Sequence, residues 1–151
     1  MINNCLIGKK IPVYGNGKQI RDWLYVDDHI NALLLVAEKG VIGETYNIGG
    51  GNQLTNIDII EMTLDMLTEY LSDKGGLNKN FNQLVEFVTD RPGHDRRYAI
   101  DFSKATAQLN WRPKRNFNEF LPNTIEWYVE NTEWVNSFGS NARTRQGLLT
   151  H

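Results

Sequence analysis

Two stretches of the chain carry apolar residues at the spacing of amphipathic helices. The first ends near Gly40 and has its apolar positions at Ile30, Leu33, Leu34 and Ala37. The second follows Thr55 and Asp58, which resemble a capping box, and has its apolar positions at Ile57, Ile60, Leu64, Leu67 and Leu71. We therefore expect a helix that Asp28 caps, and a longer helix that begins after Thr55.

Two further helices are expected in the last third of the chain. Ser103 is placed to cap a short helix that ends before Asn110. A final helix carries Phe120, Leu121, Ile125 and Tyr128. Pro122 falls inside this last pattern, so the helix either begins near Leu121 or is kinked there.

Short apolar runs bounded by turn residues predict strands between these helices. They cover residues 11–15, 21–26, 46–48 and 84–88, with another short apolar, strand-like segment at 98–100. The alternation of strands and helices predicts a mixed α/β fold, although the chain supplies few strands for a crossover sheet. Cys5, Trp23, Tyr25, Trp111 and Trp127 are expected in the core.

Residues 90–101 hold the densest cluster of chemically useful side chains. Three arginines, one histidine and three aspartates share these twelve residues, and Pro92-Gly93 interrupts them with a turn. Arginine matches phosphate with a planar fork of donors, and glycine lets a ligand approach the backbone closely. This charged turn is therefore a candidate anion site. Alternatively, its aspartates pair with its arginines on a solvated loop.

Composition narrows the possible functions. The chain has 151 residues, of which 40% are hydrophobic, and its net charge is -2, so it is expected to form one globular domain without a basic field for nucleic acid. Its single cysteine excludes a disulfide framework, and its three histidines show no metal-ligand spacing. We find no signal peptide and no apolar run near 18 residues, so no membrane association and a cytoplasmic location are expected. Gly15-x-Gly17-x-x-Ile20 fails the dinucleotide-binding fingerprint at its third position.

Six segments together resemble the dTDP-glucose 4,6-dehydratase family of the extended short-chain dehydrogenase/reductase superfamily. They are residues 11–15, 19–29, 43–50, 90–101, 109–113 and 126–128. Residues 21–26 and 46–50 match several nucleotide-sugar dehydratases and epimerases, whereas 90–98 are more specific to this family. The resemblance runs from about Ile2 to Asn136, nearly the whole chain.

The resemblance implies the carboxyl-terminal, substrate-binding part of an extended, Rossmann-like enzyme of this superfamily. Residues 1–136 would form a nucleotide-sugar-binding region with the last elements of an incomplete Rossmann sheet, and 137–151 a divergent, disordered tail. In the family, the amino-terminal half carries the NAD loop and the catalytic residues. Tyr70 and Lys74 have the spacing of a catalytic pair but fall at a helix end, where the family has no catalytic role. We expect no catalytic, cofactor-binding or metal-binding residue here, and an inactive isolated chain.

The family converts dTDP-glucose to dTDP-4-keto-6-deoxyglucose and water with NAD. By resemblance, the substrate contacts are Pro12, Arg21, Asn56, Asp90, Arg91, Pro92, Gly93 and His94. The two arginines would neutralise the diphosphate. Structural alternatives remain open: Arg21 pairs with Asp22 or Asp27, Asn56 caps its helix, His94 holds the turn, and salt bridges from Asp90, Arg96 and Arg97 hold the loop.

The implied partners are dTDP-glucose or dTDP and, as one possibility, a separate amino-terminal half; the full-length family is a homodimer. A strand at 46–48 would lack its partner strands, so we expect an exposed apolar face and self-association. Two other interpretations stay open. The chain is half of another NAD-dependent nucleotide-sugar dehydratase or epimerase, or it is a non-catalytic remnant that binds nucleotide sugars.

Overall fold

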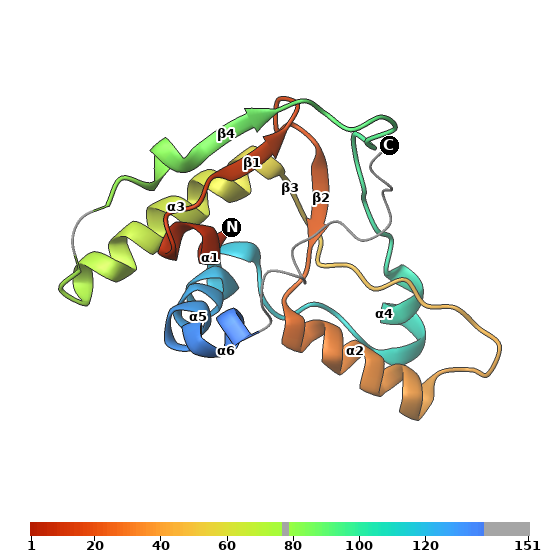
Figure 1. Cartoon of the computed structure of the whole chain (residues 1–151). Coiled ribbons are helices and arrows are strands. Elements are labelled where there is room, and N and C mark those ends of the chain that lie inside the picture. Colours follow the sequence, from red (N-terminus) through yellow and green to blue (C-terminus); the bar gives the residue numbers. More distant parts are fainter. Residues whose placement is uncertain (77–78, 138–151) are drawn as a thin grey trace.

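The computed structural model describes residues 1–76 and 79–137, which form short strands and helices around two separate cores (Figure 1). In chain order the elements are α1 (Ile2–Leu6), β1 (Ile11–Tyr14), β2 (Ile20–Trp23), α2 (Val26–Lys39), β3 (Asn52–Thr55), α3 (Asn56–Asp73), the 3-10 helix η1 (Phe81–Leu84), β4 (Val85–Val88), α4 (Ser103–Leu109), α5 (Phe117–Glu130) and α6 (Thr132–Ser137). The mixed α/β arrangement is as predicted. The predicted tail lies almost wholly outside the described residues.

Two small sheets connect these elements. β1 pairs in parallel with β4, with Ile11 opposite Val85, and β2 pairs antiparallel with β3, with Ile20 opposite Thr55. In Figure 1, β1 and β4 lie over α3, whereas β2 and β3 lead down toward α2. The turn between β1 and β2 therefore lies where the two halves of the molecule meet.

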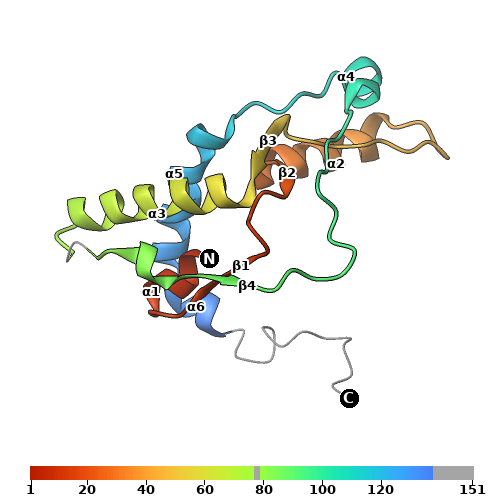
Figure 2. The same cartoon turned by 90° about the horizontal axis from the view of Figure 1, so that it is seen from above.

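The larger core lies between α3 and α5. α3 buries Ile59, Ile60, Leu64 and Leu67, and α5 buries Phe117, Phe120, Leu121 and Ile125. Figure 2 shows α5 passing beneath α3. α1 adds Ile2 and Cys5 to the same cluster, so the cysteine is the small buried hydrophobe that was expected. Burial of these side chains is the main source of stability for this half of the chain.

The smaller core joins α2 to α4. Ala32 packs with Ala105, Leu109 and Trp111, and the Trp111 ring meets Phe102 edge to face at 5.8 Å. Trp111 Nε1 also donates a 3.2 Å hydrogen bond to the Asp28 carbonyl. The apolar face predicted for α2 does not pack into this core and is exposed: Ile30, Leu33 and Leu34 are 48%, 53% and 57% exposed.

Two predicted helix caps are wrong. α2 begins one turn earlier than expected, with Tyr25 as its N-cap, and Asp28 is buried in its first turn. There the Asp28 carboxylate accepts hydrogen bonds from the Lys114 and Arg115 main-chain N–H groups, at 3.0 and 3.3 Å. At α4, Ser103 makes no capping bond, and Asp101 accepts a 2.9 Å bond from the Ser103 N–H instead.

The final helix begins at Phe117 rather than near Leu121. A capping box starts it there, because Asn116 Oδ1 accepts from Glu119 N at 3.1 Å and Glu119 Oε2 accepts from Asn116 N at 3.2 Å. Pro122 lies inside the helix that follows. The other predicted capping box, formed by Thr55 and Asp58, is confirmed.

Some predicted strands do not form in the described structure, and one predicted core residue is exposed. Residues 46–48 and 98–100 form no strand there, and the charged turn contributes a single bridge, between Ile20 and Arg97. A strand needs a neighbour to bond with, and Tyr46 and Ile48 instead pack against the smaller core. β2 ends at Trp23 rather than at residue 26. Trp111 is in the core as predicted, whereas Trp127 is 43% exposed.

Candidate functional site

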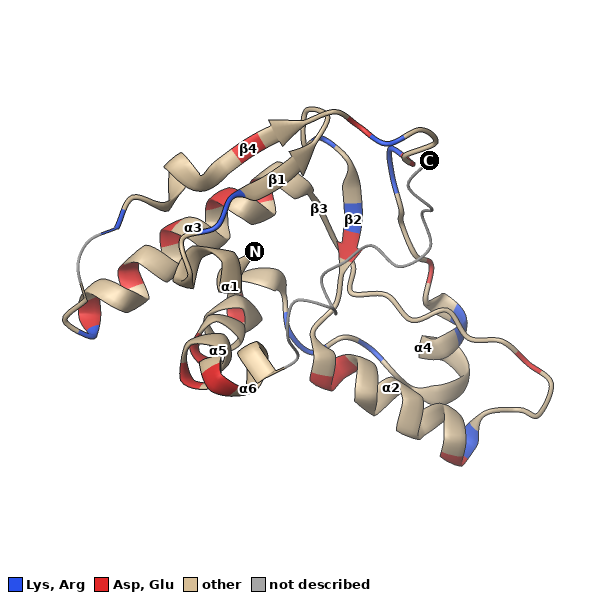
Figure 3. Ribbon diagram, in the orientation of Figure 1, with Lys and Arg blue, Asp and Glu red and all other residues tan. Residues whose placement is uncertain are grey.

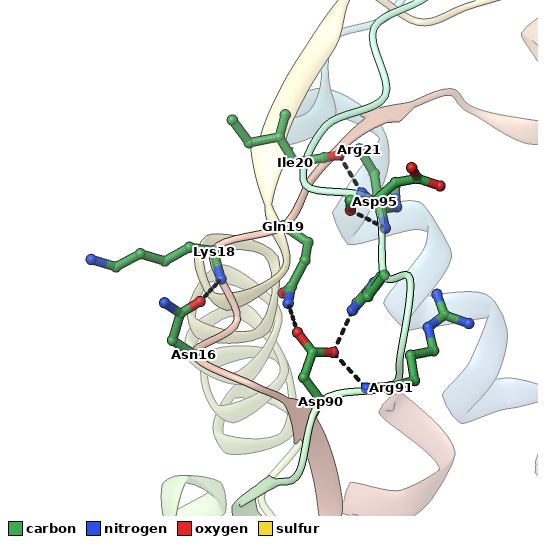
Figure 4. Close-up of polar contacts among 9 residues, drawn as sticks. Asn16, Lys18, Gln19, Ile20, Arg21, Asp90, Arg91 and Asp95 are labelled. Carbon is green, nitrogen blue, oxygen red and sulfur yellow. Dashed lines mark hydrogen bonds and ion pairs between the residues drawn. The ribbon is translucent and has the colours of Figure 1, made fainter.

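Three segments that are distant in the sequence meet at the turn between β1 and β2 (Figure 4). The first two residues of α3 donate main-chain hydrogen bonds to this turn: Asn56 N to Gln19 O and Ile57 N to Gly17 O, both at 3.0 Å. From the other side, Ile20 N donates to Arg96 O at 2.8 Å. The main chain therefore brings the start of α3 and the charged turn to one place.

Asp90 organises the charged turn. Its Oδ1 accepts from Arg91 N at 2.9 Å and lies 2.6 Å from His94 Nδ1, and its Oδ2 accepts from Gln19 Nε2 at 2.8 Å. The hydrogen bond with His94 is the main cause that lowers the pKa of Asp90, and the bonds from Arg91 and Gln19 act in the same direction against desolvation. The His94 side chain is only 5% exposed. Asp90 and His94 thus hold the shape of the turn.

The turn itself is as tight as Pro92-Gly93 predicts. His94 N donates to Arg91 O at 3.3 Å, and Gly93 has a φ of +68°, which side-chain-bearing residues rarely adopt. Arg91, Pro92 and Gly93 are all exposed on it. The Arg91 guanidinium lies 5.9 Å from the centre of the Tyr14 ring. It has no hydrogen-bond partner among the residues described, so it is available to an anion.

Arg21 supports the turn from β2. It donates from Nη1 to Ile20 O at 2.7 Å and from Nη2 to Asp95 O at 3.1 Å. Its guanidinium also lies 4.5 Å from the centre of the Tyr98 ring, whose hydroxyl bonds to the Asp95 carboxylate. The alternative in which Arg21 pairs with Asp22 or Asp27 is therefore wrong.

The alternative in which the turn's aspartates pair with its arginines is also wrong. Within the described part of the chain, the one ion pair in this turn joins His94 to Asp90. Arg97 donates instead to Gln53 Oε1 at 2.5 Å. Figure 3 shows basic and acidic residues side by side on the turn and on β2. The turn's three arginines and three aspartates balance in formal charge, but its guanidinium groups form no ion pair with its own carboxylates in the described residues.

Two clefts adjoin these residues. One has a volume of about 370 Å³ and is lined by Pro12, Tyr14, Trp23 and Asn56, among others. The second, of about 260 Å³, is lined by Asn16, Lys18, Gln19, Asp90, His94 and Arg96. The predicted contacts are thus divided: Pro12 and Asn56 belong to the first cleft, and Asp90 and His94 to the second. Asn56 is the first residue of α3 and Thr55 is the N-cap, so the capping role considered for Asn56 is wrong.

Two residues at these clefts were missed by sequence analysis. Gln19 is buried in the turn between β1 and β2, and Trp23 Nε1 is buried without a hydrogen-bond partner in the described residues. Both positions lie in the segment 19–29 that carries the family resemblance, and Trp23 was expected in the core, but neither was assigned to the site. Apart from that resemblance, nothing in the sequence distinguishes Gln19 from an ordinary polar loop residue.

The described residues do not fit an NAD pyrophosphate. That group binds where a glycine-rich turn follows a strand and opens a helix. Here Gly15 and Gly17 lie between two strands, and residues 49–51 lead into β3. Over residues 1–76 and 79–137 there is also no group of metal-ligating side chains, and no helix long and apolar enough to span a membrane.

Comparison with known proteins identifies the family. The model of the GDP-mannose 4,6 dehydratase family matches residues 1–124. The chain belongs to this family. Among curated relatives, a dTDP-glucose 4,6-dehydratase of Escherichia coli is 51% identical over 99% of this chain and 42% of its own length. A second, from E. coli K12, is 47% identical over 94% of this chain and 38% of its own length.

Solved structures of two dTDP-glucose 4,6-dehydratases and of one epimerase share this fold. The dTDP-glucose 4,6-dehydratase of Bacillus anthracis, in complex with NAD, is 43% identical and has a TM-score of 0.73 over 88% of this chain and 39% of that one. That of Streptomyces venezuelae, with NAD and TYD bound, is 38% identical, with a TM-score of 0.75 over 88% and 38%. UDP-glucose 4-epimerase of Thermotoga maritima, with UDP-glucose, is 30% identical, with a TM-score of 0.71 over 87% and 38%.

These relatives confirm the predicted resemblance to part of a dTDP-glucose 4,6-dehydratase with the extended short-chain dehydrogenase/reductase fold. The chain spans about two-fifths of the length of the curated relatives it matches, from 38% to 42%.

Proposed function

We propose that this chain is the carboxyl-terminal, nucleotide-sugar-binding part of a dTDP-glucose 4,6-dehydratase, a lyase that acts on dTDP-glucose. The supporting observation is the convergence of three distant segments on the turn between β1 and β2. Each segment carries residues expected to contact the substrate: Arg21 on β2, Asn56 on α3 and Arg91 on the charged turn. The two curated relatives and two of the solved structures named above are dTDP-glucose 4,6-dehydratases, which supports the same substrate.

The residues have different proposed roles. Arg91, whose guanidinium has no hydrogen-bond partner among the described residues, binds the diphosphate, and Arg21 adds charge while it holds the turn through two carbonyls. Asn56 and Pro12 contact the nucleoside end from the larger cleft. Asp90 and His94 hold the Pro92-Gly93 turn so that its main chain lies against the ligand.

We assign this chain binding and no chemical step. Its described residues do not fit NAD, so in this proposal the remaining part of the enzyme holds NAD and the catalytic groups. The position of Tyr70 and Lys74, which have the spacing of a catalytic pair, supports this assignment. They lie at the end of α3 that is far from Asn56. Inactivity of the isolated chain, the homodimer of the full-length family and the cytoplasmic location stay predictions.

We also infer that the exposed apolar face of α2 contacts that remaining part. Ile30, Leu33 and Leu34 lie outward on this helix, and Leu33 borders a cleft of about 420 Å³ that Ile48 and Ile100 also line. A contiguous exposed apolar patch of this kind marks an interface. The relatives are more than twice as long as this chain, so the occupant we infer is the part of the enzyme that this chain lacks.

A calorimetric titration with dTDP tests the proposed function. We expect saturable binding by the chain, at least tenfold weaker binding by Arg91→Ala, and no change in Arg112→Ala, a control at an exposed arginine outside the site. The expected loss corresponds to one charged hydrogen bond, about 1.5–3 kcal/mol. A chain that is folded by circular dichroism and binds no dTDP would contradict the proposal.

A second candidate is a part of an enzyme for another nucleotide sugar. It is favoured by the similarity to a UDP-glucose 4-epimerase and by the name of the matching family model. Titrations with UDP and GDP separate the candidates, since tighter binding of either than of dTDP would favour this second candidate. A non-catalytic remnant is distinguished by adding the separately expressed amino-terminal portion of the E. coli relative and assaying for dTDP-4-keto-6-deoxyglucose.

A further inference from the structure

Gln19 lies where the three segments of the candidate site meet, and it is only 6% exposed. Its side-chain Nε2 donates a 2.8 Å hydrogen bond to Asp90 Oδ2, and its carbonyl accepts a 3.0 Å bond from Asn56 N. Figure 4 shows the side chain reaching from the turn between β1 and β2 across to Asp90. One residue thus connects the charged turn to the start of α3.

We propose that Gln19 is the positioning residue of the nucleotide site. Its amide fixes the Asp90 carboxylate, so that the turn presents Arg91 to the same ligand that Asn56 contacts. Gln19 itself makes no contact with the ligand in this proposal. The inference rests on the proposed function, because the ligand is taken to be a nucleoside diphosphate.

The bonds of the Asp90 carboxylate show why Gln19 is needed in addition to Arg91 and His94. Its Oδ1 bonds within the charged turn, to Arg91 N and His94 Nδ1. Its Oδ2 is bonded by Gln19 alone among the described residues. The bonds inside the turn set the local shape of the turn, but they do not fix its position relative to β1 and α3. Of the bonds to this carboxylate, only the one from Gln19 reaches outside the turn.

The main chain of the β1–β2 turn is shaped to let this contact form. A Cβ atom at Gly15 would lie 2.7 Å from Asp90 Oδ2, closer than real contacts allow. Gly15 also has a φ of +60°, a conformation that favours glycine. The turn therefore lies directly against the carboxylate, and Gln19, four residues further along the chain, completes the contact.

The presence of an amide side chain at position 19 is itself informative. Gln19 Oε1 is buried and has no hydrogen-bond partner in the described part of the chain. A buried acceptor without a partner is destabilising and calls for a reason. A methionine would remove this cost but leave Asp90 Oδ2 unbonded, whereas a glutamate would place a second carboxylate against Asp90. Only the amide both fills the space and donates to the carboxylate.

The test compares Gln19→Met with Gln83→Met, which makes the same change at an exposed glutamine of η1. In the full chain we expect dTDP binding to weaken about tenfold in the first and to be unchanged in the second, as for loss of one hydrogen bond to a charged group. Gln19→Met binding as tightly as the unmodified chain would overturn the proposal.

Gln19→Glu adds a test that a merely structural role would not pass. Two adjacent carboxylates resist joint ionisation, so the pKa of one is raised. At pH 8 their repulsion opens the contact, whereas at pH 5 the protonated glutamic acid donates to Asp90 as the amide does. We expect its affinity relative to the unmodified chain to recover as the pH falls. The other charged groups that line this cleft, Lys18, His94 and Arg96, are present in both proteins. A ratio that does not change with pH would overturn the proposal.

Backbone amide NMR separates failure of this inference from failure of the proposed function. If the unmodified chain binds no dTDP, the proposed function fails, but the coupling by Gln19 is still measured. Gln19→Met should then shift the amide signals of Arg91 and His94 together with that of Asn56. Shifts confined to residues adjacent to position 19 in the sequence would overturn the inference. Should Gln19→Met not fold, the same signals in Gln19→Glu at pH 8 and pH 5 provide the comparison within one protein.

Discussion

α3 and α2 are both amphipathic helices by sequence, and the structure treats their apolar faces in opposite ways. Leu64 of α3 is 1% exposed and packs between α3 and α5, whereas Leu34 of α2 is 57% exposed. α2 does contribute to a core, but through a different stripe, Asp28, Ala32, Leu35 and Val36, that faces α4 and the segment that follows it. A helical pattern of apolar residues thus predicts a face to be covered, and it does not say whether the covering surface is in the same chain.

The largest expected difference lies between equivalent leucine truncations on the two helices. Leu64→Ala should lower the free energy of unfolding by about 2–5 kcal/mol, because it leaves a cavity in a packed core. Leu34→Ala should change it by no more than about 0.5 kcal/mol. Urea unfolding followed by circular dichroism measures both. Equal losses would mean that the face of α2 is covered in solution.

A smaller effect is expected at the buried stripe of α2. Asp28→Ala should cost about 1–3 kcal/mol, because the N–H groups of Lys114 and Arg115 lose their shared acceptor. Asp27→Ala, one residue away and exposed, is the matched control and should be close to neutral. The same unfolding measurement applies. A neutral Asp28→Ala would show that these contacts add nothing to the smaller core.

The outward face of α2 should promote self-association. Leu33→Glu places a charge in the apolar patch and should raise the concentration at which the chain associates about fivefold, the equivalent of roughly 1 kcal/mol of lost apolar burial. Lys39→Glu, exposed at the end of the same helix, is the charge control. Light scattering over a concentration series measures the shift. An unmodified chain that stays monomeric at high concentration would contradict this expectation.

The smallest effect compares acid sensitivity at the two ends of the molecule. The pKa of Asp90 is lowered chiefly by its hydrogen bond with His94, and that of Glu44 by its hydrogen bond with Lys104. A lowered folded-state pKa gives a contribution that is present at neutral pH and is lost as the pH falls through that pKa. The stability differences between the unmodified chain and Asp90→Asn or Glu44→Gln should therefore shrink below about pH 4. Melting temperatures from pH 7 to pH 3 measure this, and differences independent of pH would contradict it.

Much of the candidate site was visible in the sequence because its chemistry is local. The charged turn, its Pro92-Gly93 bend and the capping box at Thr55 each depend on residues within a few positions of one another, and the structure has all three. The pairing of the turn's charges was not predictable. Arg21 and Arg97 bond to the Asp95 carbonyl and to Gln53, and the distance between such groups depends on the packing of separate segments.

Two of the missed features have partners that are remote in the chain. Asp28 looked like a helix cap because aspartate commonly is one, but its carboxylate is bonded by Lys114 and Arg115. Residues 46–48 looked like a strand, and they form none here because strand pairing requires a neighbour that the described residues do not supply.

By itself, the sequence determined the presence of the four longest helices, the charged turn and the family to which they point, since periodicity, capping and motif spacing are properties of neighbouring residues. Only the tertiary structure decided which apolar faces are buried and which groups meet. Gln19 and Asp90 are separated by 71 positions in the chain, and the packing of β1, β4 and α3 brings them together in one 2.8 Å hydrogen bond. No local pattern encodes such a contact, because its free energy depends on where the rest of the chain places both groups.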